Sequence, residues 1–185
     1  KQPKQKNAPK RGVGRPKGSE NKPKQKSNDI QFAILEALLE MARKLFINAV
    51  RYFPMIYLTL DGYFGNQHYM RLAKQYKLEL ISKLKCNSRL FYPYDGQYSG
   101  RGKPRKYGKR VNLKNPDKKN LKATKWEDKF RYDFYQMQVW NKSYTDAQLN
   151  VVIIICTNLK TKKQSRCILF STDLELAYEK IVRYS

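Results

Sequence analysis

The 185-residue sequence predicts an α/β fold, on three observations. Residues 29–84 alternate a helix pattern and a strand pattern twice, which is typical of parallel strands joined by helices. Residues 130–171 carry long runs of β-branched and aromatic residues, which favour strands. With 41% hydrophobic and 13% aromatic residues, the chain can bury a core. A wholly disordered protein is therefore excluded.

The first predicted element is a long helix at residues 29–53. Apolar residues recur every three or four positions, at Ile34, Leu38, Ala42, Leu45 and Ala49. Asp29 is the expected N-cap, and Pro54 ends the helix because the residue before a proline avoids helical geometry. The wide apolar face predicts that this helix packs on a sheet.

Three further elements complete the alternating region. A buried strand is predicted at residues 55–60, followed by the turn dipeptide Asp61-Gly62. A helix is expected at residues 67–75, and a second strand at residues 78–84. Two parallel strands are the expected result, because a helix joins them.

The rest of the chain divides into a basic segment and a β-rich segment. Residues 85–127 are rich in Gly, Pro, Tyr, Lys and Arg, and are predicted to be a long loop or an irregular inserted element. The later elements expected are strands at 130–140, 148–157 and 165–171, a polar turn at 158–163, and a last helix at 174–184 capped by Thr172 and Asp173.

The charge is concentrated in two blocks. The chain has 39 Lys and Arg against 15 Asp and Glu, a net charge of +24. Residues 1–28 hold ten basic residues and one acid, and residues 83–131 hold sixteen basic residues and four acids. A surplus of this size predicts a polyanionic partner, most commonly nucleic acid.

The first block is predicted to be an extended, mobile arm, because it lacks periodic apolar residues. The segment 14–18 (Gly-Arg-Pro-Lys-Gly) resembles half of an AT-hook, in which Arg15 and Lys17 would lie in the minor groove of A·T-rich DNA. The alternative is a basic linker that contacts phosphates without groove specificity.

In the second block, aromatic and basic residues interleave, which suits phosphate contact and base stacking. A solvated surface loop is the alternative there.

Asp61 is the first candidate for chemistry. A carboxylate at the C-terminal end of a buried strand lies where α/β sheets bind their ligands. The alternative is an ordinary Asp-Gly turn. Two-metal chemistry needs several carboxylates, and no second acid has a convincing spacing from Asp61.

Other classes of protein are excluded by pattern. Three cysteines without a CxxC pair and a single histidine argue against a zinc module or a disulfide-stapled domain. No apolar run reaches the roughly 18–20 residues that a membrane helix needs. The chain begins with Lys and shows no signal-peptide pattern, so a cytoplasmic protein, or a piece of one, is expected.

Several segments together resemble one family. They are the strand and turn at 57–66 (YLTLDGYFGN), the basic stretch at 98–108 (YSGRGKPRKYG), the early GRPKGS at 14–19 and the final YEKIVRYS at 178–185. Each is similar to a segment of the DDE transposases of bacterial insertion sequences, which have a ribonuclease-H-like core. The resemblance covers nearly the whole chain.

The resemblance implies a mechanism and a division of the chain. Asp61 would be the second acid of the catalytic triad and a ligand of Mg²⁺ or Mn²⁺, in two-metal phosphoryl transfer on DNA. The other two acids would lie outside the chain, which would then be an inactive internal fragment that binds no metal tightly. The residues expected to grip DNA are Arg101, Lys103, Arg105, Lys106 and Arg110, with Arg15 and Lys17 in the arm.

The expected domains are a basic arm (1–28), a partial ribonuclease-H-like core (29–84), a basic insert with a β-hairpin (85–172) and the start of the closing helix (173–185). The expected partner is DNA, and the intact protein could form a homo-oligomer. The protein is expected in the bacterial cytoplasm and not in a membrane. The alternative function is a non-catalytic basic nucleic-acid-binding protein. A transposase core predicts Asp61 at the edge of a parallel sheet with the start of the 174–184 helix approaching it, whereas a binding module predicts Asp61 engaged only in its turn.

Overall fold

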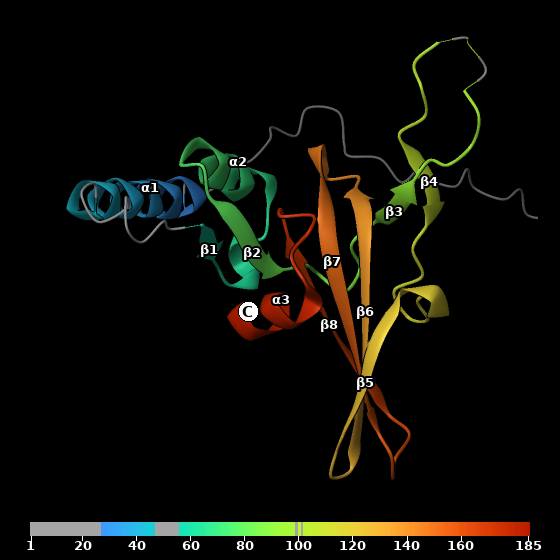
Figure 1. Ribbon diagram of the computed structural model, residues 1–185. Coiled ribbons are helices and arrows are strands. Elements are labelled where there is room, and N and C mark those ends of the chain that lie inside the picture. Colours follow the sequence, from blue (N-terminus) through green and yellow to red (C-terminus); the bar gives the residue numbers. More distant parts are fainter. Residues whose placement is uncertain (1–26, 47–55, 99, 101) are drawn as a thin grey trace, which may run out of the picture.

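The computed structural model describes residues 27–46, 56–98, 100 and 102–185, and its largest feature is an eight-stranded sheet (Figure 1). The strands are β1 (Tyr57–Thr59), β2 (Glu79–Lys83), β3 (Leu90–Pro93), β4 (Tyr107–Arg110), β5 (Leu121–Glu127), β6 (Phe130–Asn141), β7 (Tyr144–Asn158) and β8 (Gln164–Ser171). The helices are α1 (Ser27–Phe46), α2 (Gln67–Gln75) and α3 (Tyr178–Tyr184), with short 3-10 helices η1 (Gly62–Phe64) and η2 (Lys118–Asn120). The prediction of a mixed α/β fold is confirmed.

The strand order is β1-β2-β8-β7-β6-β3-β4, and β5 pairs with β6 off this path. The β1–β2 pair is parallel, as predicted for strands joined by a helix. The other pairs are antiparallel. Strand β8 pairs with both β2 and β7, so the parallel pair and the long β6–β7–β8 meander form one continuous sheet.

The sheet has a buried core on each face. Successive side chains of a strand point to opposite faces, so Val151 and Ile153 of β7 belong to one cluster and Val152 to the other. Helix α2 covers the first face with buried Tyr69, Met70, Leu72 and Ala73. Helix α3 covers the second face, where Ile181 is fully buried.

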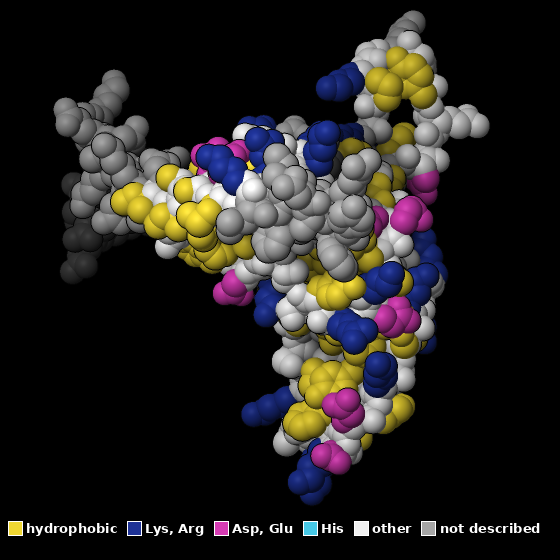
Figure 2. All heavy atoms as spheres, turned by 60° about the vertical axis from the view of Figure 1, so that its left-hand side comes forward, with side chains coloured by type: hydrophobic (Ala, Val, Ile, Leu, Met, Phe, Trp, Pro, Cys, Tyr) yellow, Lys and Arg dark blue, Asp and Glu magenta, His cyan; other side chains and the backbone are white. Residues whose placement is uncertain are grey.

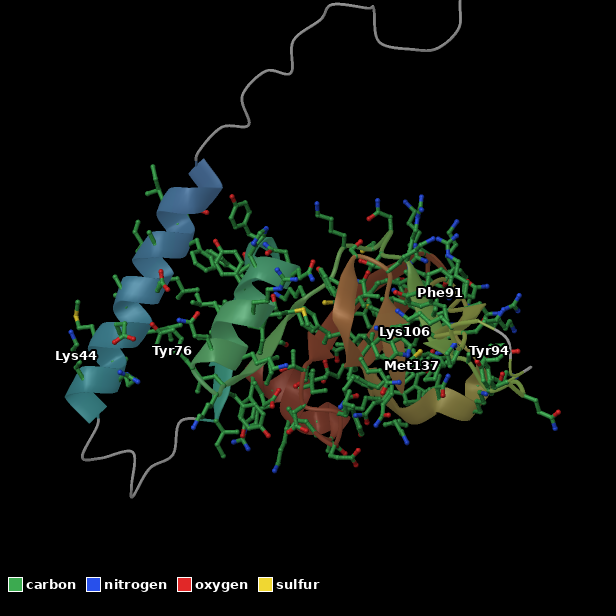
Figure 3. All side chains as sticks on the ribbon, turned by 90° about the horizontal axis from the view of Figure 1, so that it is seen from above. Lys44, Tyr76, Phe91, Tyr94, Lys106 and Met137 are labelled. Carbon is green, nitrogen blue, oxygen red and sulfur yellow. The ribbon has the colours of Figure 1, made fainter. Side chains whose placement is uncertain are left out.

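Helix α1 packs outside α2 and not directly on the sheet. The ring centroids of Phe32 and Tyr69 are 5.7 Å apart, and the Tyr76 hydroxyl donates a 2.9 Å hydrogen bond to Glu40. Figure 3 shows Tyr76 pointing from α2 toward α1. Phe32, Leu35 and Leu39 pack toward the core. A second apolar stripe of the helix faces the surface (Figure 2), formed by Ile30, Ile34, Leu38 and Met41, each more than half exposed.

Two predictions for this helix, its N-cap and its packing partner, are wrong. Asp29 was expected to be its N-cap, but α1 begins at Ser27 and Asp29 lies inside it. The predicted packing on a sheet is also corrected, because α2 lies between α1 and the sheet. The predicted residues 47–53 and the stop at Pro54 lie outside the described residues.

Most of the other elements agree with the prediction. Helix α2 has the predicted bounds, and strands β2, β6, β7 and β8 lie at the expected places with shifts of a few residues. The segment 85–127 is not a continuous loop, since it contains β3, β4 and β5, whose backbone groups pair with one another or with β6.

The last helix is shorter than predicted. It begins at Tyr178 and not at residue 174, and no side chain caps its first turn. Thr172 and Asp173 do not cap it, because they bond elsewhere. The Thr172 hydroxyl accepts from the Leu80 amide at 2.8 Å, and the Asp173 carboxylate accepts from the Glu175 amide at 2.9 Å and from the Tyr57 hydroxyl at 2.8 Å.

No helix in the described part of the chain is long and apolar enough to cross a membrane.

Candidate active site at the end of β1

Asp61 follows the C-terminal end of the parallel β1–β2 pair. The Leu60 amide continues this pairing by donating to the Ile81 carbonyl at 3.0 Å, and Asp61 is the next residue. In open α/β sheets, ligands bind beyond the carboxyl ends of the parallel strands. The structure thus places Asp61 at the edge predicted from the sequence, with its side chain exposed.

The backbone around Asp61 is held from two sides. Its Oδ1 accepts a 2.6 Å hydrogen bond from the Gly62 amide and caps η1, which is the behaviour of a turn aspartate. Its carbonyl accepts a 3.0 Å hydrogen bond from the Ser82 hydroxyl of β2. Both interpretations of Asp61 are compatible with this geometry, because a carboxylate can cap its own turn and still present an exposed oxygen.

Gly65 allows the chain after Asp61 to lie close against β2. A Cβ at this position would come well under 3.0 Å from the Lys83 carbonyl oxygen, a separation that real Cβ atoms essentially never show. The Gly65 carbonyl also accepts a hydrogen bond from the Tyr144 hydroxyl at the start of β7. These contacts fix the turn that carries Asp61 against both β2 and β7.

Among the residues that the structure describes, Asp61 offers one carboxylate ligand for a hard cation. Carboxylate oxygens are the ligands that Mg²⁺ prefers in proteins. The residues that the structure describes contain no group of three or more His, Cys, Asp or Glu side chains that could hold a metal ion. These residues therefore do not build a two-metal site by themselves, and Asp61 can contribute only one carboxylate to such a site.

The ring contacts of the last helix lie away from Asp61, so they do not support the expectation for a transposase core. Tyr178, at the start of α3, packs its ring 5.7 Å from Phe134 of β6. Tyr184, at the end of α3, packs 5.9 Å from the ring of Tyr57. Tyr57 is four residues before Asp61, or about 13 Å along an extended chain. The described part of α3 thus reaches the opposite end of β1.

Tyr57 should give the fold a distinct alkaline pH dependence. Burial, together with the hydrogen bond to Asp173, raises the pKa of Tyr57 from 10.0 to about 12. The protonated phenol is favoured in the folded state, so its stabilising contribution is complete below pH 10 and is lost as the pH rises toward 12. We expect the difference in unfolding free energy between the wild type and Tyr57→Phe to shrink over this range in urea titrations.

The matched control is Tyr98→Phe, which removes a hydroxyl that donates to the Gly102 carbonyl in an exposed loop. A Tyr57→Phe difference that stays constant from pH 9 to 12 would contradict the assignment.

The residues expected to grip DNA lie at the other edge of the sheet. Strand β4 is the last in the strand order and β1 the first, a separation of six strand spacings, or roughly 29 Å. Lys106 lies with its Nζ 3.6 Å from the ring centroid of Trp140, and Arg105 lies over Tyr94 at 5.8 Å. Figure 3 shows Lys106, Phe91 and Tyr94 together, far from α1 and Tyr76.

The residues expected to contact DNA differ in exposure, and their contact with DNA stays a prediction. Lys103, Arg105 and Arg110 are exposed, whereas Lys106 is half-buried against Trp140. The structure does not bring these four residues next to Asp61. Arg15, Lys17 and Arg101 lie outside the described residues.

A groove that begins beside Asp61 is not predictable from the sequence. Its volume is about 1040 Å³, and its walls include Gly62 and Tyr63 after Asp61, the segment 85–89 between β2 and β3, and Lys142 in the β6–β7 turn. Lys85 and Arg89 belong to the basic block identified from the sequence, but Lys142 does not. No local pattern indicates that these segments meet, because the pairing of β3 with β6 brings them together.

Comparison with known proteins gives the family. The model of the family described as DDE superfamily endonuclease matches residues 1–143, more than three quarters of the chain. This chain belongs to the DDE superfamily endonucleases. The fold of the family is ribonuclease-H-like, which confirms the predicted fold class. No curated protein and no solved structure matches the chain.

Membership in the DDE superfamily indicates the general activity. DDE endonucleases cleave DNA and generally use divalent metal ions. Asp61 is exposed at the end of the parallel strand pair, and its catalytic role in such an enzyme stays a prediction.

Proposed function

We propose that this DDE endonuclease chain is part of a DNA transposase, which binds transposon ends, cleaves DNA and joins strands by two-metal phosphoryl transfer. The observation that carries the proposal is the exposed carboxylate of Asp61 at the C-terminal end of the parallel β1–β2 pair, in a chain of this family. Asp61 supplies one carboxylate, and acids outside these 185 residues supply the others, as the family resemblance implies. We therefore expect the 185 residues alone to bind DNA but not to cleave it.

Two observations favour a second candidate, a non-catalytic nucleic-acid-binding protein. Asp61 Oδ1 is engaged with its own turn, and the described part of α3 contacts the far end of β1. Both features suit an Asp-Gly turn without catalytic chemistry. The net charge of +24 fits either candidate equally well, so charge does not discriminate between them.

The experiment that separates the two candidates is a cleavage and strand-transfer assay on labelled duplex DNA in Mg²⁺ or Mn²⁺. It compares the 185-residue chain with a version extended at both ends through the neighbouring reading frame. A transposase predicts metal-dependent nicks and joined products only with the extended version, and none in EDTA. Retention of DNA without any product in either version would favour the binding protein.

The basic segment around β4 is the proposed contact with the DNA backbone. We expect replacement of Arg101, Lys103, Arg105 and Lys106 by Ala to flatten the salt dependence of duplex binding. Each phosphate contact contributes about 0.9 to the slope of log K against log[salt], so four contacts correspond to a decrease of about 3 to 4. Fluorescence anisotropy at several salt concentrations measures this slope.

A matched control removes the same number of charges from the β5–β6 turn and the β7–β8 turn. It replaces Lys129, Lys160, Lys162 and Lys163 by Ala. The control should change the slope by less than about 1. An unchanged slope in the β4-segment variant would overturn the assignment of this segment to DNA.

A further inference from the structure

We infer that the groove beside Asp61, with walls formed by Tyr63, segment 85–89 and Lys142, binds the sugar–phosphate backbone of a DNA strand, with one base stacked on Tyr63. This inference rests on the proposed function and gives that function a second DNA-contact site, separate from the β4 segment. In Figure 1, the walls are the chain around α2, the segment between β2 and β3, and the turn that joins β6 and β7 at the top.

The charge of the groove fits a polyanion. Lys85, Arg89 and Lys142 line it, and all three are exposed. None of the lining residues is Asp or Glu. The remaining polar lining is rich in hydrogen-bond groups, namely Asn66, His68, Asn87, Ser88, Asn141 and Ser143. Lysine, arginine and neutral amide or hydroxyl side chains are the groups that contact phosphate oxygens and sugars in DNA complexes.

The walls of the groove are fixed to one another before any ligand binds. The Lys142 amide donates a 3.2 Å hydrogen bond to the Arg89 carbonyl, which joins the β6–β7 turn to the β2–β3 segment. The Tyr144 hydroxyl donates to the Gly65 carbonyl, which joins β7 to the chain that follows Asp61. Three separate segments therefore form one groove, and two of them carry its cations, so little ordering is needed on binding.

Tyr63 provides a rigid surface for a base. Its side chain is 55% exposed, although it is a large aromatic residue. Its ring meets the ring of Phe64 edge-on at 5.2 Å, and Phe64 meets Tyr69 edge-on at 5.0 Å. Tyr69 is buried in the core, so this series of rings connects the exposed Tyr63 to the protein interior. Exposed aromatic rings beside basic grooves stack nucleic-acid bases.

The location connects the groove to the candidate catalytic residue. Gly62 and Tyr63 line the groove, and Asp61 directly precedes them. A strand that follows the groove therefore passes next to the Asp61 turn. The β4 segment, at the opposite edge of the sheet, cannot position a phosphate there.

The test measures the binding of fluorescent DNA oligonucleotides to the full 185-residue chain, without metal. The groove variant combines Lys85→Ala, Arg89→Ala and Lys142→Ala. The control combines Lys160→Ala, Lys162→Ala and Lys163→Ala, which removes the same charge from the β7–β8 turn. We expect the groove variant to lose at least tenfold in affinity and about 2 to 3 in salt slope, and the control less than threefold and less than 1.

Stacking is tested with 2-aminopurine, whose fluorescence falls when it stacks. Tyr63→Ala should lose at least fivefold in affinity and most of the quenching, whereas Tyr63→Phe should keep both. The control is Trp126→Ala, because Trp126 is 63% exposed at the far end of β5.

Equal losses in the groove variant and its control would overturn the inference, as would tighter binding of an RNA of the same sequence. Such a result would leave cleavage by the extended chain, and hence the proposed function, intact. Conversely, groove-dependent binding together with an inactive extended chain would refute the proposed function and leave the groove assignment standing.

Discussion

Replacing Asp61 by Asn is expected to reduce DNA cleavage by the extended chain about 1,000-fold or more, a change of about 4 kcal/mol in the activation barrier. The substitution removes the negative charge that the proposed function requires. It keeps a side-chain oxygen able to cap η1, since Asn and Asp are equally good caps. Folding and DNA binding should therefore be retained, as measured by circular dichroism and fluorescence anisotropy.

The matched control for this change is Asp95→Asn. Asp95 also precedes a glycine and is exposed, but it lies between β3 and β4, near the opposite edge of the sheet. Its replacement should leave the cleavage rate within about twofold of the wild-type rate, which is less than 1 kcal/mol. If both variants cleave at the wild-type rate, Asp61 is a turn residue and the alternative function gains support.

Replacing Gly65 by Ala is expected to destabilise the fold by about 3 kcal/mol, at the upper end of the range for overpacking. The new Cβ would press on the Lys83 carbonyl oxygen, which is backbone and held in the sheet. Relief requires the Asp61 turn to move away from β2, which would also disturb the hydrogen bond from Tyr144 to the Gly65 carbonyl. Urea unfolding measures the loss.

Gly96→Ala is the control for this substitution. A Cβ at Gly96 would meet the side chain of Tyr94, which can rotate aside in an exposed loop. The expected cost is below about 1 kcal/mol. A Gly65→Ala chain with the same stability as the control would show that the turn after Asp61 is not held against β2.

Much of the fold follows from local pattern. The helix at 67–75 and the strands around residues 57, 80, 135, 152 and 168 were predicted because apolar periodicity and β-branched residues mark them strongly. The parallel pairing of β1 and β2 followed from the helix between them. Strands β3 and β4 were missed because each is four residues long in a segment dominated by Gly, Pro, Lys and Arg.

Contacts between residues distant in sequence explain the wrong predictions for the helix caps and for the packing of α1. Thr172 and Asp173 resemble helix caps, but they bond to Leu80 and Tyr57, about a hundred residues away in the sequence. The stripe of Ile34 and Leu38 on α1 has the pattern of a core face, yet it is exposed because Phe32 and Leu39 face the core instead. Helical periodicity shows that a helix has an apolar face but not which part of a wide face is covered.

At the candidate site, the position of Asp61 was predictable from the sequence, but the groove beside it was not. Asp61 was identified from a strand followed by Asp-Gly, and the structure places it at the predicted sheet edge. The groove beside it depends on the β3–β6 pairing, which aligns Leu90 with Asn141. That pairing brings Arg89 and Lys142 together, although more than fifty residues separate them. A charge count along the chain cannot detect such a meeting.

The most direct test of Asp61 as a catalytic acid is a metal-specificity measurement on an Asp61→Cys version of the extended chain. Cleavage of duplex DNA is measured in Mg²⁺ and in Mn²⁺, with the wild-type extended chain in parallel. A thiolate is a poor ligand for Mg²⁺, whereas Mn²⁺ accepts sulfur more readily. We expect the Asp61→Cys chain to be inactive in Mg²⁺ and to recover cleavage in Mn²⁺. If the Asp61→Cys chain cleaves DNA in Mg²⁺ at the wild-type rate, the result contradicts a role for Asp61 in the active site.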